Sequence, residues 1–152
     1  MRFRFGLEAV LRIRRIREDQ QRTLLLAANV ECDRIRLQLA AVEQDQFQRS
    51  TMVSQQIATG LWGAELQFDS DCRQQTKILR DRILLQLQEA SQRVGREREK
   101  YLSLRRDRRA IEALRDSAQQ QFEREQRRME QLGLDEIHLL SRGRTRQNLP
   151  SN

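Results

Sequence analysis

Residues that form turns are almost missing from this sequence. It has one Pro, at position 150, and six Gly among 152 residues. Sheet folds need a turn every few residues, and such turns need Gly, Pro and Asn. Their scarcity excludes a β-sandwich or an α/β enzyme. We expect an all-α protein with a few long helices and a narrow apolar seam.

Long apolar runs are also missing. The longest run of apolar residues, Leu24 to Ala28, is far shorter than the roughly 18 residues that suggest a transmembrane helix. Four Arg between positions 12 and 17 interrupt the apolar segment near the N-terminus. We therefore expect neither a membrane span nor a secretory signal.

Side chains that carry chemistry are few. Cys32 and Cys72 lack the spacing of a redox or metal motif, so we expect free thiols in a reducing cytoplasm, although an even count also allows one disulfide. The single His, His138, has no nearby Cys nucleophile. The scattered Gly residues form no phosphate-binding loop. We predict no catalytic residues, no cofactor and no metal site.

Arginine dominates the charge. Of 29 basic residues 27 are Arg, against 22 acidic residues, which gives a net charge of +7. Six Arg face Glu8 alone within the first seventeen residues. Three interpretations stay open: a solvated surface, an acidic protein partner, or nucleic acid. Nucleic acid is disfavoured because neither stacking aromatic residues nor a known binding motif accompanies the charge.

A first helix is predicted from about residue 6 to residue 58. Its clearest part is a heptad seam of Leu25, Ala28, Cys32, Ile35, Leu39, Val42 and Gln46. A displaced second stripe precedes it, formed by Leu7, Val10, Ile13, Ile16, Gln20, Thr23, Ala27 and Val30. This face is wider than one seam, so it packs against more than one neighbour or awaits a partner.

A turn at about residues 59–64 separates the two predicted helices. Gly60 and Gly63 flank Trp62 there, and Trp62 either staples the turn or contacts a partner. The second helix is predicted from about 65 to 132, where Gly133 ends it, although an N-cap at Asp69 or Ser70 would start it later. A short C-terminal segment follows, and residues 142–152 are expected to form a disordered basic tail.

The second helix has the longest regular seam. It comprises Ile83, Leu87, Ala90, Val94, Glu97, Tyr101, Leu104, Arg108, Ile111, Arg115, Ala118, Phe122, Glu125, Met129 and Leu132. This seven-residue repeat predicts a left-handed coiled coil. We expect residues 1–141 to form a single hairpin.

A short turn makes the two helices antiparallel, with position i beside about position 123 − i. Helix 2 then overhangs helix 1 by about fifteen residues, or about 22 Å. Phe122, Met129 and Leu132 continue the seam onto that overhang. They are expected to be uncovered unless an N-terminal arm bends back, and uncovered seam residues indicate a partner or self-association.

Four segments, in this order, resemble the flagellar FliJ family. They are Phe3-Arg4-Phe5 with Leu7-Glu8-Ala9-Val10-Leu11, Arg14 and Glu18; then Trp62 with Phe68; then Tyr101, Arg105, Arg109, Glu112, Leu114 and Arg115; and finally Leu134-Asp135-Glu136-Ile137. The resemblance covers nearly the whole chain. It implies a two-helix antiparallel coiled coil similar to the central stalk of rotary F-type ATPases.

The resemblance also implies a function. The family is a non-enzymatic, cytoplasmic component of the flagellar type III export apparatus, peripheral at the cytoplasmic face of the cell membrane. Implied partners are the export ATPase hexamer, the membrane export gate and export chaperones, with no small-molecule substrate. A stalk of a virulence-type secretion system, or a basic structural or nucleic-acid-binding coiled coil, is the alternative.

The resemblance assigns contacts to the two ends of the hairpin. The open end would enter the ATPase ring through Arg2, Arg4, Arg14, Phe122, Met129 and Leu132. The hairpin tip would meet the export gate through Trp62 and Phe68.

Overall fold

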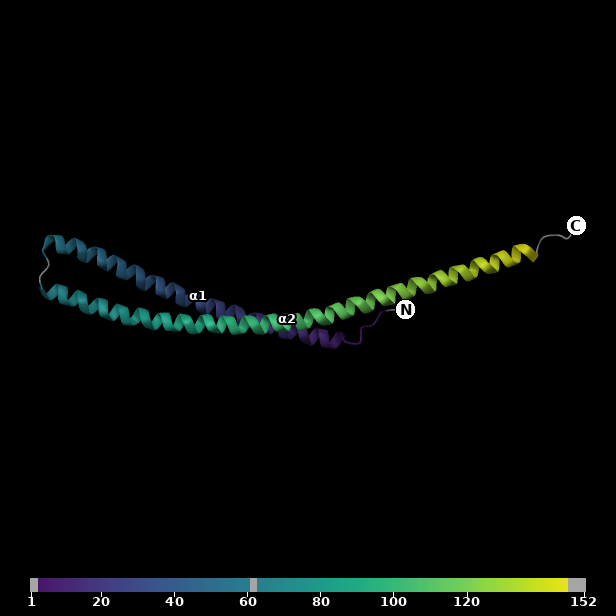
Figure 1. The fold of residues 1–152 in the computed structure, drawn as a ribbon, viewed down its shortest axis with the longest axis horizontal. Helices are drawn as coiled ribbons and strands as arrows, with labels where there is room; N and C mark the ends of the chain where they lie inside the picture. Colours follow the sequence, from purple (N-terminus) through teal and green to yellow (C-terminus); the bar gives the residue numbers. More distant parts are fainter. Residues whose placement is uncertain (1–2, 61–62, 148–152) are drawn as a thin grey trace. The chain divides into compact units, whose positions relative to one another are not determined.

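The protein folds into two long α-helices, as the sequence predicts. The computed structural model describes the backbone of residues 3–60 and 63–147, and the side chains of these residues up to position 142. Helix α1 spans Glu8–Thr59 and helix α2 spans Gly63–Gln147 (Figure 1). No strand occurs in this described part of the chain. The all-α prediction is therefore confirmed.

The connection between the helices depends on Gly60. This residue has a φ of 93°, in the left-handed region that side chains rarely adopt. Its N–H donates a hydrogen bond to the carbonyl oxygen of Ile57 at 3.3 Å, which closes the last turn of α1. The turn prediction at residues 59–64 thus falls within a residue or two of the observed break.

Helix α2 is longer than the sequence suggested. It continues through Gly133 to Gln147, so the predicted end at residue 132 and the predicted tail from residue 142 are wrong at these positions. A helical Gly costs only about 1 kcal/mol relative to Ala. The residues on both sides of Gly133 are mostly good helix formers, and the only Pro lies at position 150. Residues 148–152 lie outside the described part.

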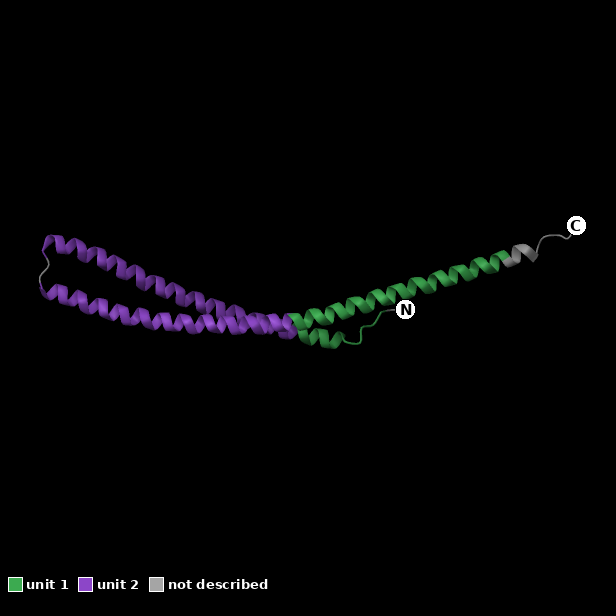
Figure 2. Ribbon diagram, in the orientation of Figure 1, with its two compact units in different colours: residues 1–15, 106–152 green, residues 16–105 purple. Residues whose placement is uncertain are grey.

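The chain divides into two compact units rather than the single unit predicted for residues 1–141 (Figure 2). Unit 1 combines residues 1–15 with residues 106–152, and unit 2 comprises residues 16–105. Each unit contains a part of both helices. The two units are described separately below.

In unit 2, α1 and α2 pack antiparallel. Arg80 forms an ion pair with Glu43 at 3.1 Å. Nearer the N-terminus, the amide Nε2 of Gln21 donates to the carbonyl oxygen of Glu97 at 3.2 Å and also to the Glu97 carboxylate. The paired positions sum to 123 and 118, which agrees with the register predicted from the turn.

The apolar core of unit 2 is narrow. Ala28, Cys32, Ile35 and Ile83 are its buried apolar side chains among the described residues. The other residues of the predicted seam in this unit are half-buried: Leu25, Leu39, Val42, Gln46, Leu87, Ala90, Val94, Glu97, Tyr101 and Leu104. Cys32 and Cys72 are free thiols, and Cys32 fills a core position. A core this small makes each of its members important for stability.

Toward the N-terminus the buried face of α1 differs from the predicted stripe. Glu18 and Gln21 are buried, whereas Ile16 and Val30 of that stripe are exposed. From Leu25 toward the N-terminus, the heptad seam continues through the polar residues Gln21 and Glu18. Gln21 is accommodated because α2 presents a polar residue, Glu97, opposite it. A paired polar layer fixes register and orientation in a coiled coil at some cost in stability.

Candidate partner-binding surfaces

An N-terminal arm, residues 3–7, lies against α2 in unit 1. Phe3 and Phe5 are half-buried while Arg4 between them is exposed. The Phe3 ring packs on the Phe122 ring with centroids 5.6 Å apart and planes at 51°. The expectation that Phe122 is uncovered is therefore wrong, and the arm covers it. Packing against α2 therefore explains why Phe alternates with Arg in the N-terminal motif.

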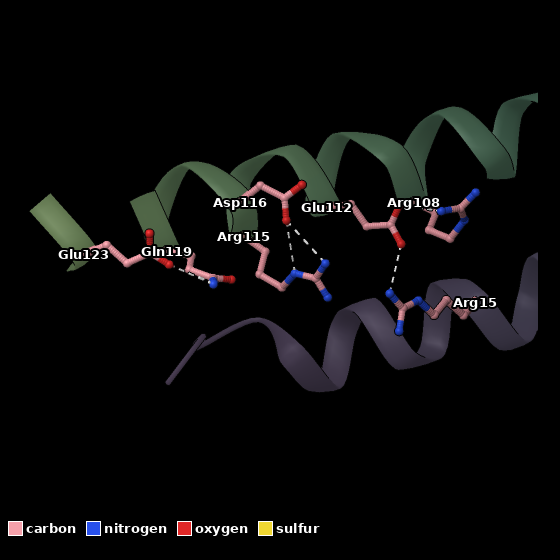
Figure 3. Close-up of polar contacts among 7 residues, drawn as sticks. All are labelled: Arg15, Arg108, Glu112, Arg115, Asp116, Gln119 and Glu123. Carbon is pink, nitrogen blue, oxygen red and sulfur yellow. Dashed lines mark hydrogen bonds and ion pairs between the residues drawn. The ribbon is translucent and has the colours of Figure 1, made fainter. Parts of the chain in front are cut away.

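Two Arg residues that follow the arm form ion pairs within unit 1. Arg14 forms an ion pair with Asp107 at 2.9 Å. Arg15 forms one with Glu112 at 2.9 Å, which Figure 3 shows. Glu112 also accepts a hydrogen bond from Arg108 on α2. Arg14 was predicted to contact a partner, but its guanidinium already has an internal carboxylate. Arg4 is exposed, and Arg2 lies outside the described residues.

Three carboxylates have lowered pKa values because cations or donors contact them. The guanidinium of Arg15, and then that of Arg108, lower the pKa of Glu112 against the opposing effect of burial. Hydrogen bonds from Gln21 and then Lys100 lower the pKa of Glu97. The hydrogen bond from Arg34 lowers the pKa of Glu31. Glu97 and Glu112 link α1 to α2 in the two units.

We expect the thermal stability of the protein to fall in acid. A carboxylate whose pKa is lower in the folded state stabilises the fold above its unfolded pKa of about 4.5, and this contribution is lost as the pH falls through the folded value. Circular dichroism melting curves should show the midpoint dropping as the pH falls below about 4.5. Combining Glu97→Gln with Glu112→Gln should flatten that drop. The exposed control Glu99→Gln should leave it unchanged, and an equal slope in all three proteins would contradict this account.

Helix α2 extends beyond the arm as an exposed helix. From residue 127 to residue 142 every residue except the half-buried Gly133 is exposed. We call residues 127–147 the overhang. Four large apolar side chains, which we call the overhang stripe, lie along one side of it: Met129, Leu132, Ile137 and Leu140. Met129 is 67% exposed, so the prediction of uncovered residues holds for Met129 and Leu132 but not for Phe122.

The spacing of the half-buried positions of α2 departs from the seven-residue repeat where the N-terminal arm ends. The half-buried positions of α2 run 115, 118, 122 and 126, so Gln126 takes the place that the strict heptad gave to Glu125, which is exposed. A straight helix drifts away from a seven-residue repeat unless it supercoils around a partner. Steps of three, four and four average about 3.67 residues per turn, which keeps one face in line. Continuing the steps of three, four and four from Gln126 leads through Met129 to Ile137, so this spacing would have predicted that Ile137 belongs to the overhang stripe.

An apolar groove lies near the turn in unit 2. It has a volume of about 640 Å³. Its lining comprises the apolar or weakly polar side chains of Met52, Val53, Ala64, Phe68 and Cys72 and the polar ones of Arg49, Gln56, Glu65 and Asp69. Phe68 is 71% exposed, so its ring offers most of its surface to solvent. Of the two residues predicted for the tip, Phe68 lines this groove and Trp62 lies outside the described residues. Sequence reasoning missed Met52, because it lies off the seam.

The remaining predicted residues have simpler surroundings. Ile111 is half-buried in unit 1, and His138 is exposed on the overhang. Among the described residues, no group of three or more His, Cys, Asp or Glu side chains could hold a metal ion. None of the described helices has an apolar stretch long enough to cross a membrane.

Comparison with known proteins identifies one family. The model of the family described as "Flagellar FliJ protein" matches residues 3–147 of this chain, which is nearly its whole length. No curated protein and no solved structure matches the chain.

Proposed function

Because this chain belongs to the flagellar FliJ family, which is linked to flagellar protein export, we propose that it is a non-enzymatic stalk of the export apparatus. In this proposal the overhang of α2 inserts into the ring of the export ATPase, while the groove near the turn contacts the membrane export gate. The protein works in the cytoplasm and reaches the membrane face through the gate. Family membership also supports a role in handling export chaperones.

The overhang carries this proposal. A single polar helix in water is only marginally stable, and most helices gain their stability from packing an apolar face. The overhang presents such a face, formed by Met129, Leu132, Ile137 and Leu140, without a neighbour among the described residues. A ring of subunits would surround a helix of this kind and bury its stripe. Exposed Arg residues elsewhere in unit 1, such as Arg4 and Arg12, would favour an approach to an acidic ring.

The proposed mechanism needs no covalent chemistry. Binding across the interfaces between ATPase subunits stabilises the assembled ring relative to free subunits, by linkage. One helix cannot make identical contacts with every subunit of a ring. Its contacts therefore differ between subunits, and differential contacts can bias their nucleotide states. Purified chain should bind the flagellar export ATPase and raise its rate of ATP hydrolysis; failure of both would refute the proposal.

The groove near the turn suits a short apolar segment of the gate. Combining Met52→Ala with Phe68→Ala removes two of its apolar walls and should weaken binding to the cytoplasmic part of the gate protein at least about tenfold, or about 1.4 kcal/mol. Binding to the export ATPase should not change. Titration calorimetry with each purified partner measures both.

Phe47→Ala is the matched control for this experiment. Phe47 is 72% exposed and Phe68 is 71% exposed, but Phe47 lies outside the groove. The control should bind the gate normally. Equal weakening by the control, or equal loss of both partners in the groove variant, would show that the groove has no specific role.

A further inference from the structure

The two long edges of the hairpin in unit 2 differ in charge. In an antiparallel helix pair, the residues that directly precede seam positions line one edge, and those that directly follow seam positions line the other. On the first edge, Glu31 and Arg34 of α1 line one pocket together with Glu89 and Arg93 of α2, and all four precede a seam residue. Arg34 pairs with Glu31 at 2.6 Å. Two acidic and two basic residues therefore balance each other on this edge.

The opposite edge carries arginine residues without a counter-charge. Three of them directly follow seam positions 21, 97 and 104: Arg22, Arg98 and Arg105. None of the three forms an ion pair with a described residue, whereas the neighbouring Lys100 pairs with Glu97. At the positions that follow the seam within residues 19–29 and 95–105, three Arg stand against Asp19 alone, which gives +2. This stretch of the edge therefore attracts anions.

The register places two of these Arg residues beside each other. The observed pairs of unit 2 sum to 118 and 123, so Arg22 of α1 lies beside residues 96–101 of α2, a range that includes Arg98. Both side chains are exposed. Two guanidinium groups on neighbouring helices repel each other, and a carboxylate placed between them attracts both. The pair is suited to an acidic ligand.

Two leucines and a glycine lie among these Arg residues. Leu26 is 56% and Leu102 40% exposed, and both directly follow a seam residue. Gly95 follows the seam too, and a Cβ at this position would meet nothing within 4 Å. Packing within the described chain therefore does not require Gly here, although Gly weakens a helix. Its bare backbone lets another chain approach closely. We call this surface the basic edge, and it consists of Arg22, Leu26, Gly95, Arg98, Leu102 and Arg105.

We propose that the basic edge binds an acidic amphipathic helix of a partner protein. Arg98, Leu102 and Arg105 follow one another at steps of four and three, the steps at which a helix repeats one of its faces. A partner helix that lies along α2 presents its own side chains at the same steps. A face on which carboxylates alternate with Leu or Ile therefore complements the edge in both charge and polarity.

Other anionic partners fit this surface less well. The positions that follow the seam within residues 19–29 and 95–105 include no aromatic residue on which bases could stack. The exposed Leu26 and Leu102 would gain nothing from phosphate groups. The basic edge shares no residue with the overhang stripe or with the groove near the turn, so the inference does not depend on the proposed function.

The first test measures how a synthetic acidic helix binds to the full chain. The probe is an Ala-rich peptide of about three heptads in which Glu and Leu alternate at steps of four and three. Fluorescence anisotropy should show binding that weakens as salt is added. Combining Arg22→Gln with Arg98→Gln should weaken binding at least about tenfold.

The control combines Arg17→Gln with Arg82→Gln. Both of these Arg residues are exposed and directly precede a seam residue, so the control removes the same charge from the other edge. It should bind the peptide normally. The absence of binding, equal weakening in both double variants, or equal binding of a scrambled peptide would overturn the inference.

Gly95→Gln gives an independent test, because its two expected effects have opposite signs. Gln favours a helix more than Gly does and meets no neighbour at this position, so the midpoint of thermal unfolding should rise. The same side chain fills the space that the partner helix needs, so peptide binding should weaken at least about tenfold. Gly133→Gln, at another open Gly of α2, should leave peptide binding unchanged. Normal binding by Gly95→Gln would contradict the close approach.

Two further probes distinguish an acidic helix from other anions. Vesicles that contain phosphatidylserine, and a duplex DNA, should bind more weakly than the peptide at the same ionic strength. Neither should discriminate between the Arg22→Gln, Arg98→Gln variant and its control. Tighter binding of either probe, lost only in that variant, would assign the basic edge to lipid or nucleic acid and overturn the inference.

Discussion

Deleting residues 127–152 should return ATP hydrolysis by the export ATPase to its basal rate, while the rest of the chain stays folded. The deletion removes the whole overhang stripe. It keeps Phe122 and the Phe3 ring that covers it. It also keeps the ion pairs Arg14–Asp107 and Arg15–Glu112, which join α1 to α2 in unit 1. The loss would therefore be a loss of docking rather than of folding.

The comparison that makes this result meaningful is a shorter deletion. Removing residues 143–152 leaves all four members of the overhang stripe in place. This variant should stimulate the ATPase as the full chain does. Circular dichroism should show cooperative melting for both variants. Full stimulation by the longer deletion would contradict the proposed docking surface.

Ile83→Asp should destabilise unit 2 by about 3–5 kcal/mol, because it removes a buried aliphatic side chain and places a carboxylate in its site. Ile83 is 6% exposed and is one of four buried apolar side chains among the described residues of this unit. With a core of this size, neighbouring residues cannot replace its packing. Urea unfolding followed by circular dichroism gives the free energy of unfolding.

Leu85→Asp tests whether burial is the cause. Leu85 lies two residues further along α2 and is 63% exposed, so its loss should cost well under 1 kcal/mol. If Ile83→Asp leaves too little folded protein to measure, Ile83→Val should still cost about 0.5–1.5 kcal/mol. Equal costs for the two Asp variants would show that the seam does not hold the helices together.

The sequence determined the fold more fully than it determined the surfaces. The scarcity of Gly and Pro requires long helices, and the turn at Gly60 defines the pairing of the helices by simple counting. The pairs Glu43–Arg80 and Gln21–Glu97 follow that count. These predictions depend on local rules that act within one helix or one turn.

Most of the errors concern interactions between segments, and the predicted helix end at Gly133 is the exception. Apolar periodicity within α1 could not reveal that Gln21 is buried, because the reason is Glu97 on the other helix. Whether Phe122 is exposed depended on whether the N-terminal arm reaches it, and the Phe3 ring of the arm packs on it. Gly133 alone cannot end a helix whose flanking residues favour one. The half-buried position moves from the expected Glu125 to Gln126 where the arm ends, and heptad counting does not take the end of the arm into account.

The proposal that the overhang docks in the ATPase ring can be tested directly by crosslinking. A photoreactive residue replaces Met129 in one protein and Leu85 of unit 2 in another, and each is illuminated in complex with the stimulated ATPase. We predict a covalent product with the ATPase from position 129 and none from position 85. The absence of a product from position 129, in a complex whose ATP hydrolysis is stimulated, would contradict the proposal that the overhang is the docking element.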